Sequence, residues 1–296
     1  MLHAPPFDSK RVAYWTGSEK KLAYRHVKPC SGVGKCNSAA VVLFLNGLLS
    51  NMNGTKCNFL QQHCEKIGAG FHCFDYRGHG ESSGHFVDCT VHDWVADASD
   101  MLDHAISLGK QDDPRQQQQQ QQQPNIILVG SSLGAWIALI LAMNRSDVNI
   151  CAVVGIGSAI DYTCNTYNDK LTYEQRAMWD GSVESNSTSN VIEVCSPYLD
   201  DKFPFTKDLY KSGNEYLIMD YTGQRNQHKK LRCPVRFLHG SEDDVIHFSE
   251  INKVAEVLKS KYGAVDVSIN ILQGADHRVS RLDDIAVILD TVDEFL

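Results

Sequence analysis

The sequence predicts an α/β fold, in which a mostly parallel sheet is covered by helices on both faces. Short apolar, β-branched runs alternate along the chain with stretches of helical period, as expected for strands followed by crossover helices. The run Ala39–Leu45 is continuously apolar, which is typical of a strand buried on both faces. With 296 residues and 43% hydrophobic composition, the chain can bury a large core as a single α/β domain.

The predicted elements can be followed in order along the chain. Arg11–Gly17 and Leu22–Val27 alternate apolar and polar side chains, like an antiparallel hairpin at a sheet edge. After the Ala39–Leu45 strand we expect a helix at Thr55–Ile67, a strand at Phe71–Tyr76, a helix at Val91–Leu108, a strand at Ile126–Val129, a helix at Leu133–Met143 and a strand at Ile150–Ile156. The alternation continues at Val235–Leu238, Glu250–Tyr262, Val267–Leu272 and Leu282–Phe295.

Two segments interrupt this alternation. Gln116–Gln123 is a glutamine run bounded by Pro114 and Pro124, and its composition cannot bury apolar surface, so we expect a disordered loop at about 112–124. The segment Asp161–Leu231 is rich in aromatic, Asn, Ser and Asp residues and shows no strong period. An excursion of this length inside an α/β sheet is expected to be a functional lid, a cap insertion at about 161–231.

Composition excludes several classes of protein. A formal net charge of −8 argues against a nucleic-acid partner, because phosphate backbones select for clustered Lys and Arg. No run approaches the roughly 20 apolar residues of a membrane span. We see no secretory signal or transit peptide and expect a cytoplasmic protein. The ten cysteines form no CxxC pair or zinc-like cluster, so reduced thiols and no metal site are expected.

A Gly-x-Ser-x-Gly pattern can expose a nucleophilic serine on a sharp turn from a strand into a helix, and it occurs twice. Gly130–Gly134 follows a predicted strand and opens a predicted helix, so Ser132 is the candidate nucleophile. Its neighbour Ser131 occupies the x position, and its side chain should point elsewhere. Gly80–Gly84 leads into no apolar helix, so a plain turn is expected there.

A serine nucleophile needs a base and an acid. Where the serine lies on a turn from a strand into a helix, the acid follows it in the chain and the histidine follows the acid. The strand Val235–Leu238 runs into a turn that contains Glu242, Asp243 and Asp244. Asp243 is the candidate acid because the chain re-enters the core directly after this turn, and the two flanking acids are expected to be exposed. His277 lies between the last strand and the last helix and is the candidate base.

Acyl transfer also needs hydrogen-bond donors for the developing oxyanion. We expect one from the backbone N–H of Leu133, directly after the nucleophile, and another from Leu48 in the loop Asn46–Leu49. An ordinary Asn-Gly turn is the alternative reading of this loop.

The segments LNGLLSNMNGTK, FDYRGHGESSG, VGSSLGAWIAL, LHGSEDDVI and GADHR together resemble the α/β-hydrolase superfamily. Within it they look like the abhydrolase group that includes a mitochondrial acyl-protein (palmitoyl) thioesterase, also credited with acyl-glucuronide esterase activity. The resemblance implies the α/β-hydrolase fold with an eight-stranded sheet, a Ser132–His277–Asp243 relay and a cap over an acyl pocket. The chain departs from the family where Asn46 stands in place of the usual Pro, and in having no visible transit peptide.

The resulting hypothesis is a serine hydrolase that cleaves ester or thioester bonds of small-molecule or acylated-protein substrates through an acyl-enzyme. No metal or organic cofactor is required, and the oligomeric state is left open. Two alternatives stay open. An aminopeptidase would need an amine-recognising acid pair, for which Asp200 and Asp201, or Asp208, are candidates. A non-catalytic receptor with the same fold would bind acyl ligands without releasing product.

Overall fold

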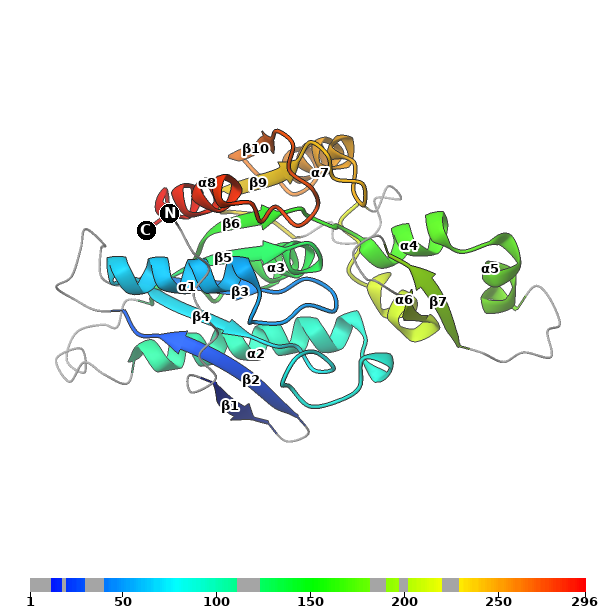
Figure 1. Ribbon diagram of the computed structural model, residues 1–296, viewed down its shortest axis with the longest axis horizontal. Helices are drawn as coiled ribbons and strands as arrows, with labels where there is room; N and C mark the ends of the chain where they lie inside the picture. The colour runs from blue at the N-terminus through cyan, green and yellow to red at the C-terminus, as the bar shows by residue number, and fades with distance from the viewer. Residues whose placement is uncertain are drawn as a thin grey trace.

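The centre of the molecule is an eight-stranded sheet with the strand order β1-β2-β4-β3-β5-β6-β9-β10 (Figure 1). The computed structural model of the 296-residue chain describes residues 12–17, 20–29, 40–110, 123–181, 190–196, 202–219 and 229–296. The strands β1 (Ala13–Thr16) and β2 (Lys21–Val27) are antiparallel to their neighbours at one edge. The other strands are parallel: β4 (Gly70–Phe74), β3 (Ala40–Leu45), β5 (Asn125–Ser131), β6 (Ile150–Ile156), β9 (Val235–Gly240) and β10 (Val267–Leu272).

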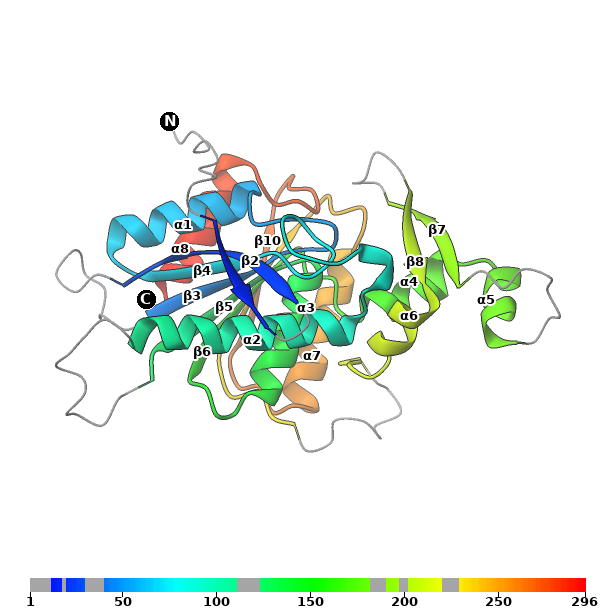
Figure 2. The same cartoon turned by 90° about the horizontal axis from the view of Figure 1, so that it is seen from below.

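Helices cover both faces of the sheet. In Figure 2, α1 (Thr55–Ile67) and α8 (Leu282–Asp293) lie on one face, and α2 (Val91–Lys110), α3 (Leu133–Asn144) and α7 (Phe248–Ser260) lie on the other. Side chains of β3 alternate between the two apolar cores, with Leu43 in the core under α2 and α3 and Phe44 in the core under α1. A continuous apolar strand is therefore required here, because both of its faces are buried.

Residues 161–181, 190–196 and 202–219, which we call the β6–β9 segment, lie beyond the carboxyl ends of the parallel strands (Figure 1). The segment contains α4 (Tyr162–Lys170), α5 (Tyr173–Asp180), the antiparallel pair β7 (Val191–Cys195) and β8 (Lys202–Thr206), and α6 (Lys207–Gly213). Contacts attach it to the helices below. Ser212 Oγ accepts a hydrogen bond from the N–H of Val91 (3.0 Å), and Trp136 Nε1 donates to the carbonyl of Tyr216 (3.2 Å).

The predicted fold class is confirmed: a mostly parallel sheet of eight strands with helices on both faces. The framework elements begin and end within a few residues of the predicted positions. The elements inside the β6–β9 segment were not predicted. The expected glutamine loop lies outside the described residues, apart from Gln123 and Pro124. No helix in the described part of the chain is long and apolar enough to span a bilayer.

Candidate active site

Ser132 lies on a sharp turn between β5 and α3. Its backbone has φ 53° and ψ −116°, a positive-φ conformation outside the left-handed helical region that a residue with a side chain adopts only under strain. Two glycines make the turn possible, because a Cβ on Gly130 would lie 2.3 Å from the carbonyl oxygen of Gly134, and one on Gly134 would lie 2.1 Å from that of Leu45. The local sequence therefore exposes the Ser132 hydroxyl at the carboxyl edge of the sheet.

The structure brings Ser132, His277 and Asp243 together from three different loops. The His277 Nε2 atom lies 3.0 Å from Ser132 Oγ, and its Nδ1 atom lies 2.8 Å from Asp243 Oδ2. A carboxylate only accepts hydrogen bonds, so Nδ1 carries the proton and Nε2 is left to accept from the serine hydroxyl. This is the arrangement in which an imidazole can remove a proton from the serine.

Asp243 is buried in a site that favours its charged form. Burial alone would raise its pKa, but hydrogen bonds from His239 and His277 and from the backbone N–H of Ile246 hold the pKa well below its ordinary value. The Oδ1 atom accepts from the N–H groups of Val245 (3.0 Å) and Ile246 (2.8 Å). The carboxyl group therefore stays ionised and oriented toward His277.

His239, near the end of β9, is a second histidine partner of Asp243 and was not among the residues selected from the sequence. Its Nε2 lies 3.2 Å from Asp243 Oδ2 and 2.7 Å from the carbonyl oxygen of Ile246. Both neighbours are acceptors, so Nε2 carries a proton and donates to them. No local pattern marks this role, because it depends on a buried side-chain orientation at the end of β9.

The loop after β3 passes directly beside the serine. A Cβ on Gly47 would lie 3.3 Å from Ser132 Cβ, so a glycine allows this close approach. Asn46 is buried, and its Nδ2 donates to the carbonyl of Phe74 (2.7 Å), which fixes the loop to the end of β4. Leu48 and Leu133 line the same cavity as Ser132. Leu133 is the first residue of α3, so its N–H has no acceptor within the helix.

A cavity of about 470 Å³ lies at these residues, between the sheet edge and the β6–β9 segment. Apolar side chains from both sides line it: Leu48, Leu49, Tyr162, Val194 and Phe203. Its described lining also holds three cationic side chains, Lys56, Lys170 and Arg278, and no carboxylate. The cavity can therefore hold an apolar chain next to Ser132, with positive charge around it.

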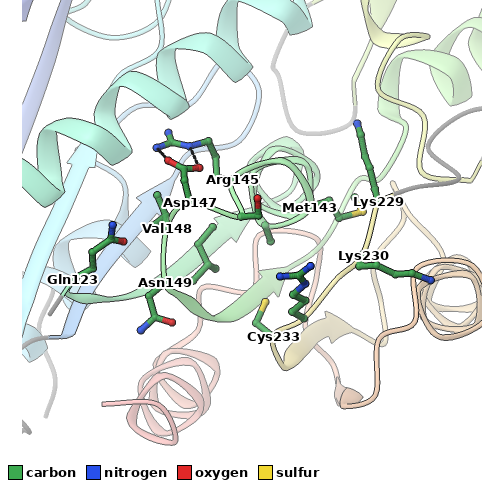
Figure 3. A pocket seen from close by; sticks show the side chains of 13 residues that line it. Gln123, Met143, Arg145, Asp147, Val148, Asn149, Lys229, Lys230 and Cys233 are labelled. Atoms are coloured by element: carbon green, nitrogen blue, oxygen red, sulfur yellow. Dashed lines mark hydrogen bonds and ion pairs between the residues drawn. The ribbon is translucent and has the colours of Figure 1, made fainter.

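A larger hollow of about 740 Å³ lies where β6 and β9 begin, at the amino ends of the parallel strands (Figure 3). It is lined in part by Arg145, Asp147, Lys229 and Lys230, and Figure 3 shows the Arg145–Asp147 ion pair. None of the three residues of the candidate site lines it, so we place the active site in the smaller cavity.

The residues that the sequence offered as alternatives for the nucleophile and the acids have other environments. Ser82, in the second Gly-x-Ser-x-Gly pattern, donates to the carbonyl of Asp75 (2.6 Å). As expected, no apolar helix follows this turn: the next element is a one-turn 3-10 helix at Phe86–Asp88, none of whose residues is buried. Glu242 and Asp244 are exposed. Asp208 is exposed in the first turn of α6 and does not line the cavity, while Asp200 and Asp201 lie outside the described residues.

The fold and this site define an α/β hydrolase. A sequence profile of the family described as "Serine aminopeptidase, S33" matches residues 37–281, and the chain belongs to this family.

Within the curated proteins, the chain is similar to mitochondrial palmitoyl-protein thioesterase ABHD10 of Bos taurus, with 27% identity over 93% of this chain and 76% of the relative. The Rattus norvegicus protein of the same name is 30% identical over 86% of this chain and 74% of the relative. The solved structure of mouse alpha/beta hydrolase domain-containing protein 10 superposes with a TM-score of 0.72 and 26% identity, covering 96% of this chain and 97% of that one.

Proposed function

We propose that this hydrolase cleaves carboxylic ester or thioester bonds of acyl substrates, with Ser132 as nucleophile, His277 as base and Asp243 as the orienting acid. The observation that carries the proposal is the position of His277, with one ring nitrogen 3.0 Å from Ser132 Oγ and the other 2.8 Å from Asp243 Oδ2. The strained backbone of Ser132 and the depressed pKa of Asp243 support the same assignment.

The chemistry follows from this geometry. His277 Nε2 takes the Ser132 proton as Oγ attacks the carbonyl carbon, and Asp243 stabilises the imidazolium that forms. The imidazolium then protonates the leaving alcohol or thiol, which leaves an acyl-enzyme on Ser132. Water, deprotonated by His277, attacks this intermediate and releases the carboxylic acid.

The negative charge on the tetrahedral oxygen needs donors that are already in place. We assign this role to the backbone N–H groups of Leu133 and Leu48. The position of Leu133 at the start of α3 supports its assignment, because the helix N-terminus carries partial positive charge. The close approach of Gly47 to Ser132 supports that of Leu48.

The β6–β9 segment is assigned as a cap of about 161–231 that completes the acyl site. Tyr162 and Phe203, from α4 and β8, line the cavity opposite Leu48 and Leu49. An apolar acyl chain would be removed from water between these two walls, at a gain of about 0.8 kcal/mol per buried methylene group.

The charge of the cavity favours an acyl substrate over a peptide with a free amino terminus. An aminopeptidase needs a carboxylate to bind the substrate ammonium, and the described lining offers Lys56, Lys170 and Arg278 instead. The ABHD10 relatives are named palmitoyl-protein thioesterases, which supports acyl substrates, including acylated proteins.

The ABHD10 relatives are also named mitochondrial, which favours that compartment over the cytoplasm. Imaging of a tagged full chain would test this localisation.

Hydrolysis of matched oxyesters and thioesters of increasing acyl length tests this proposal. Wild-type turnover should exceed that of Ser132→Ala by at least about 10⁴-fold, because the acyl-enzyme cannot form without the hydroxyl. Ser131→Ala is the matched control and should keep activity within about threefold of wild type, because its hydroxyl has no assigned role. A folded wild type that binds acyl ligands but releases no product would instead identify a receptor.

A further inference from the structure

We propose that Lys56 is a positioning residue that holds the loop carrying His277 from the opposite side of the cleft. Its Nζ atom donates a hydrogen bond of 2.5 Å to the carbonyl oxygen of Arg278, the residue directly after His277. Lys56 is the second residue of α1, and it lines the same cavity as Ser132 and His277. This inference rests on the proposed function in one respect, that His277 is the base.

The loop that Lys56 contacts is strained. Val279 has φ 45°, a left-handed conformation that is unfavourable for a β-branched side chain, and it is fully buried. Such strain persists only where surrounding contacts hold it. The contacts that hold this loop therefore decide where His277 lies.

Both polar atoms of the peptide unit between Arg278 and Val279 are held by side chains. Asp276 Oδ1 accepts a hydrogen bond from the N–H of Val279 (3.2 Å) and another from the N–H of Arg278 (3.0 Å). Lys56 holds the carbonyl of the same peptide unit. Asp276 belongs to the His277 loop itself. Lys56 belongs to α1, the helix that follows the proposed oxyanion loop. Lys56 therefore fixes the His277 loop relative to the oxyanion loop.

The electrostatics show why the carbonyl is the main partner of Lys56. No carboxylate in the described part of the chain lies within ion-pair distance of its Nζ. Burial lowers the pKa of Lys56 to about 8; Asp276 and Asp284 oppose this shift and Arg278 adds to it. The ammonium form is the stronger donor, so the contact is strongest below pH 8 and weakens as the pH rises through that value.

The test compares Lys56→Met and Lys56→Arg with wild type. Lys66→Met is the matched control, because Lys66 is exposed in the last turn of the same helix. We expect Lys56→Met to lower both kcat and the rate of Ser132 labelling by a fluorophosphonate by about tenfold to a hundredfold, as for other small misplacements of a catalytic group. KM and the urea midpoint should change little, Lys56→Arg should recover most of the rate, and Lys66→Met should match wild type.

A pH profile gives a readout that a merely structural role would not change. Wild-type kcat should fall as pH rises through about 8, whereas Lys56→Arg should keep its rate, since the guanidinium stays charged. The inference is overturned if Lys56→Met labels at the wild-type rate, if only KM changes, or if Lys56→Arg gives no rescue. A wrong proposed function would give another result: the wild type would be labelled at Ser132 but would hydrolyse neither esters nor thioesters.

Discussion

At the residue scale, the three proposed catalytic side chains could be predicted, but two of their supporting partners could not. Ser132, Asp243 and His277 each follow a predicted strand, so pattern and chain order were enough to expect them together at one edge of the sheet. His239 was missed because its contact with Asp243 depends on a side-chain rotamer. Lys56 was missed because its partner is 222 residues away in the sequence. Strand ends can be read from hydrophobic patterns, whereas contacts between loops depend on the complete fold.

Asp243→Asn should lower kcat by about 10³–10⁴-fold while the protein remains folded. The amide oxygen can still accept from the N–H groups of Val245 and Ile246. The amide nitrogen would then face His277 Nδ1, which must become an acceptor, so the proton moves to Nε2 and the ring can no longer deprotonate Ser132.

Steady-state ester hydrolysis and circular dichroism would measure both parts of this prediction. Asp244→Asn is the control, since this neighbouring carboxylate is exposed, and its kcat should stay within about twofold of wild type. Equal losses in the two variants would contradict the assignment of Asp243.

At the element scale, the framework was predictable and the β6–β9 segment was not. The inner strands β3, β4, β5, β6 and β9 are mostly buried runs, the edge strands β1 and β10 alternate, and each framework helix buries apolar side chains, so tertiary burial agrees with the local pattern. The segment elements are only five to nine residues long, shorter than the window in which a period can be recognised. One local signal was present: Thr172 and Gln175 form a capping box at the start of α5.

A histidine cluster between β2, β4 and α2 should make the sheet edge sensitive to acid. His72 is fully buried, and neither of its ring nitrogens has a hydrogen-bond partner among the described residues. Its ring lies 5.2 Å from that of Tyr24 and 5.7 Å from that of His104. Burial, with repulsion from His104 and His26, lowers the pKa of His72 well below its ordinary value.

The unfolded chain therefore binds a proton at His72 that the folded protein does not, once the pH falls below about 6.5. This term should lower the free energy of unfolding by about 1 kcal/mol between pH 7.5 and pH 5.5. Urea titrations of wild type and His72→Phe at both pH values would isolate it. A pH dependence in the variant as steep as in wild type would exclude His72 as the source.

At the scale of the whole molecule, the candidate site lies between the sheet and the β6–β9 segment. The sheet supplies Ser132, Asp243 and His277 from its carboxyl edge, and the β6–β9 segment supplies part of the opposite apolar wall. The sheet and its helices enclose two large apolar cores. The β6–β9 segment adds side chains such as Phe205, Leu209 and Ile218 to the core under α2 and α3, and it forms hydrogen bonds to these two helices. Substrate preference is expected to vary with the β6–β9 segment, because its cavity-lining side chains lie outside the eight-stranded sheet.

One polar contact ties the two ends of the β6–β9 segment together. Asp161, directly before α4, is buried and accepts hydrogen bonds from the N–H groups of Ile218 (2.8 Å) and Met219 (2.7 Å), beyond α6. Asp161→Ala leaves both N–H groups without this acceptor, at a cost of about 1–3 kcal/mol for each group that stays buried. The loss falls on local opening of the segment, because Asp161 and both N–H donors belong to it.

Trypsin cleavage inside the segment, at residues such as Lys170 and Lys207, should therefore be at least about tenfold faster in Asp161→Ala than in wild type. Asp208→Ala is the matched control, since Asp208 lies on the same segment but is exposed. Its cleavage rate should stay near that of wild type. If the segment closes the acyl site, Asp161→Ala should also discriminate less between short and long acyl esters. Cleavage of Asp161→Ala at the control rate would mean that other contacts hold the segment.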